Sequence, residues 1–399
     1  MKILYLCHRF PFKPNSGSKV RAFNMIQHLS QSHEVTVASL VRSQAEAEEG
    51  EGIAPYCHRY LMERVTLPGA MTRVLLGVPT AAPASMAYFH SPRLARRIRE
   101  ELRRTAFDLI FVHCSSVAHY VADVPGIPKI LDFADMDSQK WLDYARARAF
   151  PVSMVYRVEG EKLCRAEKRL ARKFDLCTCI TQAEYETLVG YGTNTPAAWF
   201  PNGVDLEFFK PGAEAYDPDR IVFVGRMDYF PNQQGAVEFC DRVMPLIRAK
   251  RPAASFTIVG AEPSPEVVAL GERPGVTVTG TVPDVRPYIT GAALSVAPLR
   301  IARGTQNKIL EALAMGVPVV SSGTAAKGVD AVVGEHFLAA DDPQEVADLI
   351  LRVMEDAGER ERLARAGRAR MESHHNWPAA MRRLDAIIED CLSQRRRAA

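Results

Sequence analysis

The sequence lacks the features that mark several large classes of protein. Its eight cysteines include no C-x-x-C pair, so they give no sign of a zinc or thiol redox site. Several of them lie inside apolar runs, which favours reduced cysteines that pack as small hydrophobic residues over a disulfide framework. Lysine plus arginine (50) nearly balance aspartate plus glutamate (47). The net charge of +3 gives no general attraction to nucleic acid, and we expect no such partner.

Targeting segments and the common phosphate loops are also missing from the pattern. Residues 2–7 form an apolar run without the longer apolar segment and cleavage site of a signal peptide. The longest uncharged stretch, residues 74–92, has the length of a membrane span, but prolines, a glycine and a histidine interrupt it. No G-x-G-x-x-G follows the first apolar run, and no Walker loop occurs, which argues against a dehydrogenase. These observations predict a cytoplasmic protein.

What the sequence does contain is the pattern of a folded α/β protein. Its 399 residues predict two compact domains, and 47% hydrophobic with 24% charged residues is an ordinary globular balance. Short apolar runs alternate with helical patterns, which favours parallel sheets covered by helices on both faces. The strands are expected at residues 2–7, 34–40, 59–67, 108–113, 129–133, 175–180, 220–225, 255–260, 276–280, 294–298, 317–321 and 336–339.

A segment rich in proline, glycine and asparagine, residues 193–212, separates the two series of strands. We therefore predict an N-terminal domain over 1–195 and a C-terminal domain over 196–377. Residues 378–399 carry apolar side chains at helical spacing and predict a terminal helix that packs back on the N-terminal domain. Ligands of such sheets bind outside the carboxyl ends of the strands, so we expect a ligand site in a crevice between the domains.

The most informative segment covers residues 296–321, where an apolar strand runs into a polar loop, a helix that starts near Thr305, and a second apolar strand. The free N–H groups of a helix start favour an anion, and Lys308 adds a charge suited to phosphate. Glu311 lies one turn later and can accept hydrogen bonds from ribose hydroxyls. Alone, this segment is explained as well by a solvated helical ion pair of a few tenths of a kcal/mol.

A second segment, residues 221–232, favours the nucleotide over the ion pair. Here an apolar strand ends in Gly225 and Arg226, and an aromatic loop follows. Arg226 leaves the strand at its carboxyl end, so its forked guanidinium can reach phosphate oxygens in the same crevice. Gly225 allows the backbone to approach a ligand closely. The alternative is an arginine that only pairs with an acidic neighbour at the domain edge.

Three motifs together resemble glycosyltransferase family four of the GT-B fold. They are F-P-N-G-V-D-L-E-F-F from Phe200, F-V-G-R from Phe223, and N-K-I-L-E-A-L-A-M-G-V-P-V-V from Asn307. The likeness covers most of the chain and implies two facing Rossmann-like domains with parallel sheets and an interdomain cleft. The opening from Leu4, with Gly17 and Arg21, and the segment 132–141 are similar to bacterial sugar transferases associated with exosortase/PEP-CTERM exopolysaccharide loci.

This resemblance implies retaining transfer of a sugar from a nucleoside diphosphate sugar to a glycan or lipid-linked acceptor, as a hexosyltransferase that uses no metal ion and no other cofactor. It implies that Arg226 and Lys308 hold the diphosphate, that Glu311 holds the ribose, and that the loop Ser16-Gly17-Ser18 approaches the phosphates. The expected catalytic residues are Arg226, Lys308 and His113. The expected donor-binding residues are Gly17, Gly225, Arg226, Asn232, Gly304, Thr305, Gln306, Asn307, Lys308 and Glu311.

The chain departs from the family pattern at two positions. Many members carry a glutamate eight positions before the ribose glutamate, where it contacts the donor sugar, but this chain has Arg303. Many also carry a lysine five positions after the motif arginine, where this chain has Pro231, followed by Asn232. The first departure leaves the donor sugar open. For the second, the asparagine–lysine pair at Asn307 and Lys308 implies that Lys308 supplies the charge.

One histidine and a set of three aspartates in the first half of the chain can each be interpreted in two ways. His113 ends a predicted strand and resembles a family histidine near the donor sugar, while a core histidine bonded to backbone fits equally well. Asp132, Asp135 and Asp137 suggest a metal cluster or acceptor contacts. Helix capping before residues 138–144 explains at least part of this acidity, so we assign no metal.

Residues 93–104 form a basic amphipathic pattern with Leu94, Ile98 and Leu102 as a narrow apolar stripe. With the uncharged residues 74–92, this segment can rest on an anionic membrane and bring a lipid-linked acceptor to the cleft, at the inner face of the cytoplasmic membrane. A solvated helix that packs on its own domain explains the same pattern and is slightly favoured.

Two other functions fit the same architecture. A nucleotide-sugar epimerase also needs a diphosphate site between two domains, and isomerised donor without acceptor distinguishes it from a transferase. Because Arg303 replaces an acidic sugar contact, the chain also fits a non-catalytic nucleotide-sugar-binding subunit. Donor binding without hydrolysis or transfer favours that function.

Overall fold

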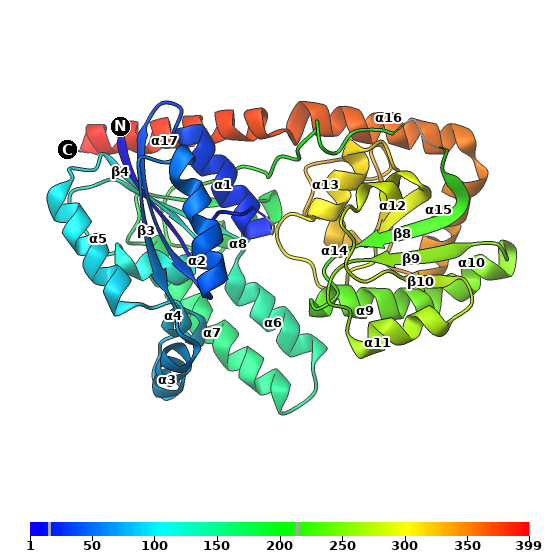
Figure 1. Ribbon diagram of the computed structural model, residues 1–399, viewed down its shortest axis with the longest axis horizontal. Helices are drawn as coiled ribbons and strands as arrows, with labels where there is room; N and C mark the ends of the chain where they lie inside the picture. Colours follow the sequence, from blue (N-terminus) through cyan, green and yellow to red (C-terminus); the bar gives the residue numbers. More distant parts are fainter. Residues whose placement is uncertain (15–16, 213–214, 399) are drawn as a thin grey trace. The chain divides into compact units, whose positions relative to one another are not determined.

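The computed structural model of the chain describes residues 1–14, 17–212 and 215–398 (Figure 1). The chain forms two compact units. Unit 1 combines Met1–Phe200 with Met381–Ala399, and unit 2 covers Pro201–Ala380. The boundary between the units falls between Phe200 and Pro201. The predicted boundary, between residues 195 and 196, is a few residues earlier. Ser16, part of the loop expected near the phosphates, lies outside the described residues.

Unit 1 is built on a seven-stranded parallel sheet with the order β3-β2-β1-β4-β5-β6-β7. Most of these strands are continuous apolar runs, as expected for strands that are buried on both faces. The strands are β1 (Lys2–Cys7), β2 (Glu34–Val41), β3 (Arg59–Arg64), β4 (Leu109–His113), β5 (Lys129–Ala134), β6 (Leu176–Cys179) and β7 (Ala197–Trp199). The helices of this unit are α1 (Gly17–Leu29), α2 (Gln44–Gly50), α3 (Leu67–Gly77), α4 (Ala84–Tyr88), α5 (Pro92–Arg104), α6 (Asp137–Ala147), α7 (Val152–Ala171), α8 (Gln182–Val189) and most of α17 (Trp377–Ala398).

Unit 2 repeats this architecture on a six-stranded parallel sheet with the order β10-β9-β8-β11-β12-β13. Helices lie on both sides of the sheet, with α12 and α13 on one side and α9 and α11 on the other (Figure 1). The strands are β8 (Asp217–Val224), β9 (Ser255–Val259), β10 (Val276–Val278), β11 (Ala292–Ala297), β12 (Val319–Ser321) and β13 (Leu338–Ala339). The helices are α9 (Phe230–Glu238), α10 (Met244–Lys250), α11 (Pro265–Ala269), α12 (Arg286–Thr290), α13 (Asn307–Ala314), α14 (Gly323–Ala326), α15 (Pro343–Glu355) and α16 (Ala357–His374).

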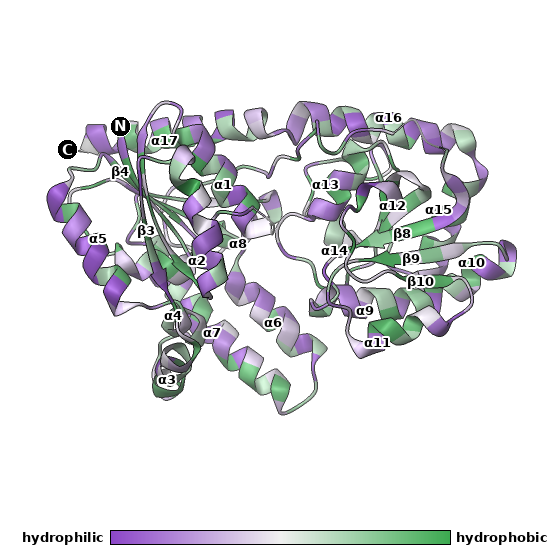
Figure 2. Ribbon diagram, in the orientation of Figure 1, coloured by the Kyte–Doolittle hydropathy of each residue, from purple (hydrophilic) through white to green (hydrophobic). Residues whose placement is uncertain are grey.

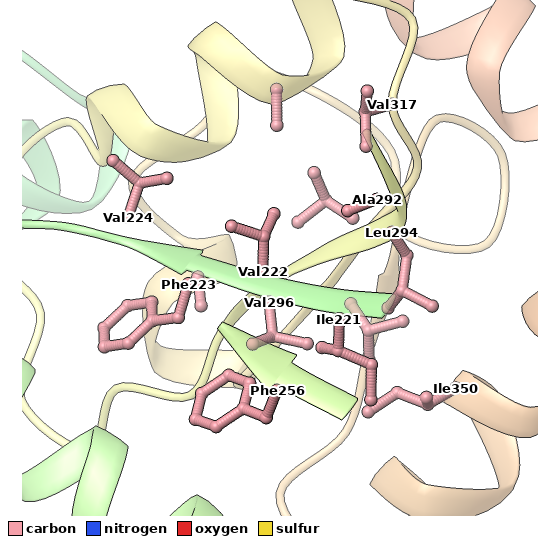
Figure 3. Packing of buried hydrophobic residues seen from close by; sticks show 14 of the residues in the cluster. Ile221, Val222, Phe223, Val224, Phe256, Ala292, Leu294, Val296, Val317 and Ile350 are labelled. Carbon is pink, nitrogen blue, oxygen red and sulfur yellow. The ribbon is translucent and has the colours of Figure 1, made fainter. Parts of the chain in front are cut away.

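The core of unit 2 forms where apolar strands meet the apolar faces of helices. Phe223 on β8 and Phe256 on β9 are fully buried, and Figure 3 shows them beside Val296 on β11. Ile350 on α15 is also fully buried and approaches the sheet in the same view. The hydropathy colouring of Figure 2 shows β8, β9 and β10 in green, while the helices alternate between green and purple turns. Each full burial of such a side chain contributes about 1.5–3 kcal/mol.

The last helix, α17, has an apolar stripe that is buried. Met381, Leu384 and Ile388 are each no more than 3% exposed. Two polar contacts also hold this helix in unit 1: His28 Nε2 lies 2.9 Å from the Asp385 carboxylate, and Arg395 donates to Asp175 at 2.6 Å.

Some element boundaries differ from the expected ones. The strand expected over 59–67 ends at Arg64, because Leu67 begins α3 with Pro68 in its first turn. Strand β7 was not expected, because it is only three residues long and directly follows Pro196. It lies at the edge of the sheet. Helix α13 starts at Asn307, two residues after the expected Thr305.

The aspartates near residue 135 do not cap the following helix. The cap position of α6 is Met136, which makes no side-chain capping bond, and Asp137 lies in the first turn. The capping expectation is therefore wrong.

Helix α5 packs on its own unit, and this settles the choice between the two readings of residues 93–104. Leu94 and Ile98 are no more than 1% exposed, so the apolar stripe faces the core. Arg97 donates to Glu63 on β3 at 2.8 Å, and Arg59 pairs with Glu101 at 3.5 Å. Within the described ranges, we find no helix whose length and apolarity suit a bilayer crossing.

Candidate functional site

In unit 2 the candidate residues follow two strands that lie side by side. The chain builds β9 and β10 on one side of β8 and then places β11 on the other, so the strand order reverses between β8 and β11. Ligands of open parallel sheets bind outside the carboxyl ends of the strands at such a reversal. Arg226 follows β8, and the loop to α13 follows β11. The topology therefore brings both sequence motifs to one edge of one sheet.

The side chain of Arg226 lies in an exposed cluster of carboxylates. Its Nε and Nη2 donate to the two oxygens of Asp228 at 3.0 and 2.8 Å, and Nη2 also donates to Glu262 at 2.7 Å. The arginine thus pairs with acidic neighbours, as its alternative reading expected. Exposed pairs of this kind contribute about 0–1 kcal/mol, so an anionic ligand can replace these carboxylates at small cost.

A buried amide, Asn232, links the two motifs. Its Nδ2 donates to the backbone oxygen of Arg226 at 2.8 Å, and its Oδ1 accepts from Lys308 Nζ at 2.6 Å. Gly225 leaves room for this amide, because a Cβ at that position would lie 2.7 Å from Asn232 Nδ2. Lys308 Nζ also lies 4.9 Å from the ring centroid of Phe223, within the range of a cation–π contact. The two motifs therefore form one structural cluster.

Lys308 and Glu311 are both half-buried and lie close enough for their charges to interact. Burial lowers the pKa of Lys308 to about 7, and the nearby Glu311 carboxylate opposes this shift. Burial raises the pKa of Glu311 to about 7, and Lys308 opposes that shift in turn. Loss of solvation disfavours the charged form of each group. Near neutral pH this pair is therefore poised between its charged and neutral forms, unlike the solvated ion pair of the alternative reading.

The loop before α13 carries polar groups in a constrained backbone. Gly304 has φ of +62°, a conformation that favours glycine, and Gln306 donates from its side-chain amide to the Arg303 oxygen at 3.1 Å. The hydroxyl of Thr305 is buried and has no hydrogen-bond partner in the part of the chain that the structure describes. Asn307 accepts weakly from Asn202 at 3.5 Å. An unsatisfied buried hydroxyl is rare and marks this loop as a place for a polar ligand.

The loop that carries Arg226 depends on a close contact between two glycines. A Cβ at Gly260, just after β9, would lie 1.7 Å from the Gly225 oxygen. We expect Gly260→Ala to destabilise unit 2 by about 3 kcal/mol, because the backbone must move apart. Hydrogen exchange of β8 amides measures this loss. Gly280→Ala is the control, since its φ of +68° costs about 1 kcal/mol but nothing lies within 4 Å of its Cβ. Equal losses in the two variants would contradict the contact.

Unit 1 has a second polar cluster at its own strand reversal, between β1 and β4. His113, the last residue of β4, is 1% exposed, and its Nδ1 lies 2.8 Å from Asp132 Oδ2 on β5. His113 is therefore bonded to a carboxylate and not to backbone, which corrects the core reading of this residue. Its Nε2 is buried and has no partner among residues 1–14, 17–212 and 215–398. The hydrogen-bonding capacity of this nitrogen is therefore unused among those residues.

Asp132 is held by a buried arginine. Arg21 on α1 donates from Nε to Asp132 Oδ2 at 3.0 Å, and Thr178 donates to the other oxygen at 2.9 Å. Burial alone would favour the neutral acid, but the Arg21 charge and the bond with His113 lower the pKa of Asp132 below its usual range. The carboxylate is therefore charged and accepts the hydrogen bond from Nδ1–H of His113.

Two strained residues flank this cluster. Cys114 after β4 has φ of +83°, and Ala134 at the end of β5 has φ of +57°. Such conformations cost about 1–3 kcal/mol for residues with a Cβ and gather at functional sites. His8 also lies here, with its ring centroid 6.2 Å from that of His113, and no local sequence signal singles it out. The sequence analysis did not foresee that Arg21 and Asp132 pair, because only the parallel register places Asp132 beside His113.

The predicted site residues thus fall into the two units separately. Gly17 begins α1, one turn before Arg21, and belongs to unit 1 with His113. Within unit 2, hydrogen bonds join the neighbourhoods of Arg226, Asn232 and Lys308. The remaining predicted residues of unit 2 lie in the same two motifs: Gly225, Gly304, Thr305, Gln306, Asn307 and Glu311.

Two protein-family models match the chain, one in each unit. The model described as Glycosyltransferase Family 4 matches residues 15–208, and the model described as Glycosyl transferases group 1 matches residues 218–356. A curated relative from Corynebacterium glutamicum, a GDP-mannose-dependent monoacylated alpha-(1-6)-phosphatidylinositol monomannoside mannosyltransferase, is 24% identical over 244 residues. The match covers 56% of this chain, and the chain spans 64% of the length of that relative.

Solved structures show the same fold along nearly the whole chain. HepE from Anabaena, crystallised in complex with UDP, superposes with a TM-score of 0.72 at 14% identity, over 98% of this chain and 100% of that chain. The sucrose-phosphate synthase from Thermosynechococcus elongatus gives a TM-score of 0.71 at 15% identity, over 99% and 100% of the two chains. With two Rossmann-like units on parallel sheets and family models over both of them, this chain belongs to glycosyltransferase family 4 and has the GT-B fold.

Proposed function

We propose that this protein is a retaining, metal-independent hexosyltransferase that moves a sugar from a nucleoside diphosphate sugar to a glycan or lipid-linked acceptor. The observation that carries the proposal is the hydrogen-bonded chain from Lys308 through Asn232 to the backbone of Arg226. It joins the lysine to the backbone of the arginine at one edge of the unit 2 sheet, and the loop before α13 adds the buried, unsatisfied hydroxyl of Thr305. A diphosphate needs cations and donors in this arrangement.

The proposed roles follow from charge. As the bond between the anomeric carbon and the diphosphate breaks, its electron pair goes to the leaving oxygen, where negative charge grows. Lys308 and Arg226 stabilise that charge because they are in place before the reaction. Glu311 accepts hydrogen bonds from the ribose. Gly225, Gly304, Gln306, Asn307 and, in unit 1, Gly17 complete the proposed donor-binding set.

Retention is proposed to proceed from the front face of the sugar. The acceptor oxygen bonds to the anomeric carbon on the face that the diphosphate leaves, and the acceptor proton passes to the leaving phosphate. His113 is proposed to contact the donor sugar through its free Nε2, which can accept a hydrogen bond from a sugar hydroxyl. The carboxylate of Asp132 is engaged with Arg21 and His113, so we assign it no nucleophilic role.

The relatives support the donor class and leave its base open. Their names include a GDP-mannose-dependent mannosyltransferase and a structure of HepE with UDP-glucose. We propose a role in exopolysaccharide or glycolipid assembly, with the protein placed at the inner face of the cytoplasmic membrane. The relative that acts on a phosphatidylinositol mannoside favours a lipid-linked acceptor.

The test begins with thermal shifts against UDP, GDP, ADP and their sugars, and continues with transfer assays with the stabilising donor in the presence of EDTA. We expect one nucleotide class to raise the melting temperature, and product NMR to show the anomeric configuration of the donor. An inverted product contradicts retention, and loss of activity with EDTA contradicts metal independence. Isomerised donor without acceptor indicates an epimerase instead. Binding without hydrolysis or transfer across an acceptor panel indicates a binding subunit.

Binding of a nucleoside diphosphate is also expected to draw a proton into the protein. The pKa of Lys308 is about 7 before binding, so a large part of its amine is neutral at pH 8. A diphosphate beside it favours the charged form and raises that pKa. Titration calorimetry at pH 8 in buffers of different ionisation enthalpy should show net proton uptake, which disappears in Lys308→Met. Uptake that persists in this variant assigns the proton to another group.

A further inference from the structure

Large apolar side chains that are exposed to solvent concentrate in two segments of unit 1. Ten of the seventeen in the described chain lie within residues 67–78 and 150–158, with exposures from 44% to 79%. We call them the α3–α7 apolar surface: Leu67, Met71, Leu75, Leu76, Val78, Phe150, Val152, Met154, Val155 and Val158. Soluble proteins rarely leave so many together, and such patches mark interaction sites.

Helix α3 presents its apolar face to solvent. Leu67, Met71, Leu75 and Val78 follow one another at spacings of four, four and three residues, so they share one face. A helix of a globular protein normally turns such a face to the core. Here only Ala70 is buried within the helix.

The two segments form one surface because they are joined by hydrogen bonds. Lys162 on α7 donates to the Val78 oxygen at 2.8 Å. The buried carboxylate of Glu159, also on α7, accepts from the backbone N–H groups of Ala84 and Ser85 at 2.9 and 3.0 Å. Figure 1 shows α3 and the ends of α6 and α7 extending from the same side of this unit.

The charged and aromatic residues near the α3–α7 apolar surface indicate whether a lipid bilayer or a second copy of the chain covers it. Neither residues 64–99 nor residues 144–158 contain an aspartate or glutamate, while both contain arginines. Arg146 and Arg157 pair with the flanking carboxylates of Asp143 and Glu161 at 2.6 and 3.1 Å. Trp141 on α6 and Tyr156 on α7 are in contact, with ring centroids 5.3 Å apart and ring planes tilted by 59°. Amphipathic tryptophan and tyrosine with apolar and basic side chains match an anionic bilayer surface. Two copies of the same basic surface would repel each other, which disfavours a dimer.

We propose that the α3–α7 apolar surface docks on an anionic lipid bilayer and inserts its side chains at the headgroup boundary. The inference rests on the proposed function, which places the protein at the inner face of the cytoplasmic membrane. It assigns the membrane contact to the α3–α7 apolar surface and not to α5. Docking there holds unit 1 at the surface where a lipid-linked acceptor is found.

Flotation in a density gradient tests this with two kinds of vesicle, pure phosphatidylcholine and an equal mixture with phosphatidylglycerol. We expect the full chain to float with the anionic vesicles and to stay at the bottom with the neutral ones. The triple variant Leu75→Ser, Leu76→Ser, Val155→Ser should partition on the order of a hundredfold less well, because three apolar insertions are lost. The pair Arg146→Glu, Arg157→Glu should lower partitioning about tenfold or more.

Matched controls come from equally exposed positions of unit 2. The triple variant Val268→Ser, Val332→Ser, Val333→Ser removes apolar side chains that are 53%, 52% and 47% exposed, and should float like the parent. All variants should transfer sugar to a water-soluble acceptor as the parent does, so failure of docking is distinguishable from failure of the proposed transferase.

Two results overturn the proposal. One is undiminished flotation of the Leu75, Leu76 and Val155 variant. The other is a lipid-free oligomer, seen by light scattering, that this variant abolishes, since a second copy then covers the surface.

Discussion

Lys308→Ala is expected to lower the turnover number on the order of a hundredfold or more, the size of loss seen when a preorganised charge-stabilising group is removed. The lysine amine lies 2.6 Å from Asn232 Oδ1, so it is held in place before any substrate arrives. It is thus proposed to meet growing charge on the leaving diphosphate without reorganisation. Initial rates at saturating donor measure this effect.

Arg226→Ala is expected to lower turnover to a similar extent, for the same reason. Matched controls are available in unit 2. Lys250 pairs with Asp348 and Arg273 with Asp241, both in exposed ion pairs. Lys250→Ala and Arg273→Ala remove the same charges and should leave turnover unchanged. If Lys308→Ala and Arg226→Ala both keep normal turnover, the assignment of the diphosphate to these cations is wrong.

Asp132→Ala is expected to lower the free energy of unfolding of unit 1 by about 3–5 kcal/mol. The carboxylate is fully buried, and its loss leaves the guanidinium of Arg21, 1% exposed, without its counter-charge. Urea denaturation followed by tryptophan fluorescence of a Trp377→Phe background reports on this unit, because Trp141 and Trp199 lie in it and Trp377 lies in unit 2. Asp123, which pairs with Lys173 at the surface, is the control, and Asp123→Ala should leave the midpoint unchanged.

The Asp132 carboxylate is also expected to make the stability of unit 1 depend on pH in the acid range. Its pKa in the folded protein is lowered by Arg21 and His113, below the ordinary aspartate value of about 3.9. Its contribution is therefore complete at pH values above that ordinary value, and it is lost as the pH falls towards the folded pKa. Asp132→Asn should remove this part of the acid dependence. An unchanged acid profile in that variant would assign the dependence to other carboxylates.

Much of the fold could be predicted because buried parallel strands are continuous apolar runs. All twelve expected strands correspond to strands of the structure, with ends that differ by a few residues. One exception is informative. Nothing in the three residues of β7 distinguishes them from the linker, and its pairing with β6 alone makes it a strand. For residues 93–104 the slightly favoured interpretation, a helix that packs on its own domain, is confirmed, because Leu94 and Ile98 face the core.

The candidate site was predictable to the extent that its residues follow strands closely. Arg226 lies in the loop just after β8, and Lys308 lies in the first turn of a helix after β11, so a local motif carries both positions. The partners of these residues were not predictable. Asn232 links the two motifs across 76 positions of sequence, and Arg21 reaches Asp132 across 111. Such pairs depend on strand order and register, which no local pattern encodes.

The amino-acid sequence by itself determined the alternation of apolar runs and helices, the two-domain organisation and the cationic motifs, because these depend on residues close together along the chain. Only the tertiary structure decided which groups are buried together: the Asp132 carboxylate against Arg21 and His113, and the Lys308 amine against Asn232. It also decided that the apolar face left to solvent is that of α3 and not α5. Burial and pairing are properties of contacts between distant segments, and they alone set the charge state of a buried group and the exposure of a helix face.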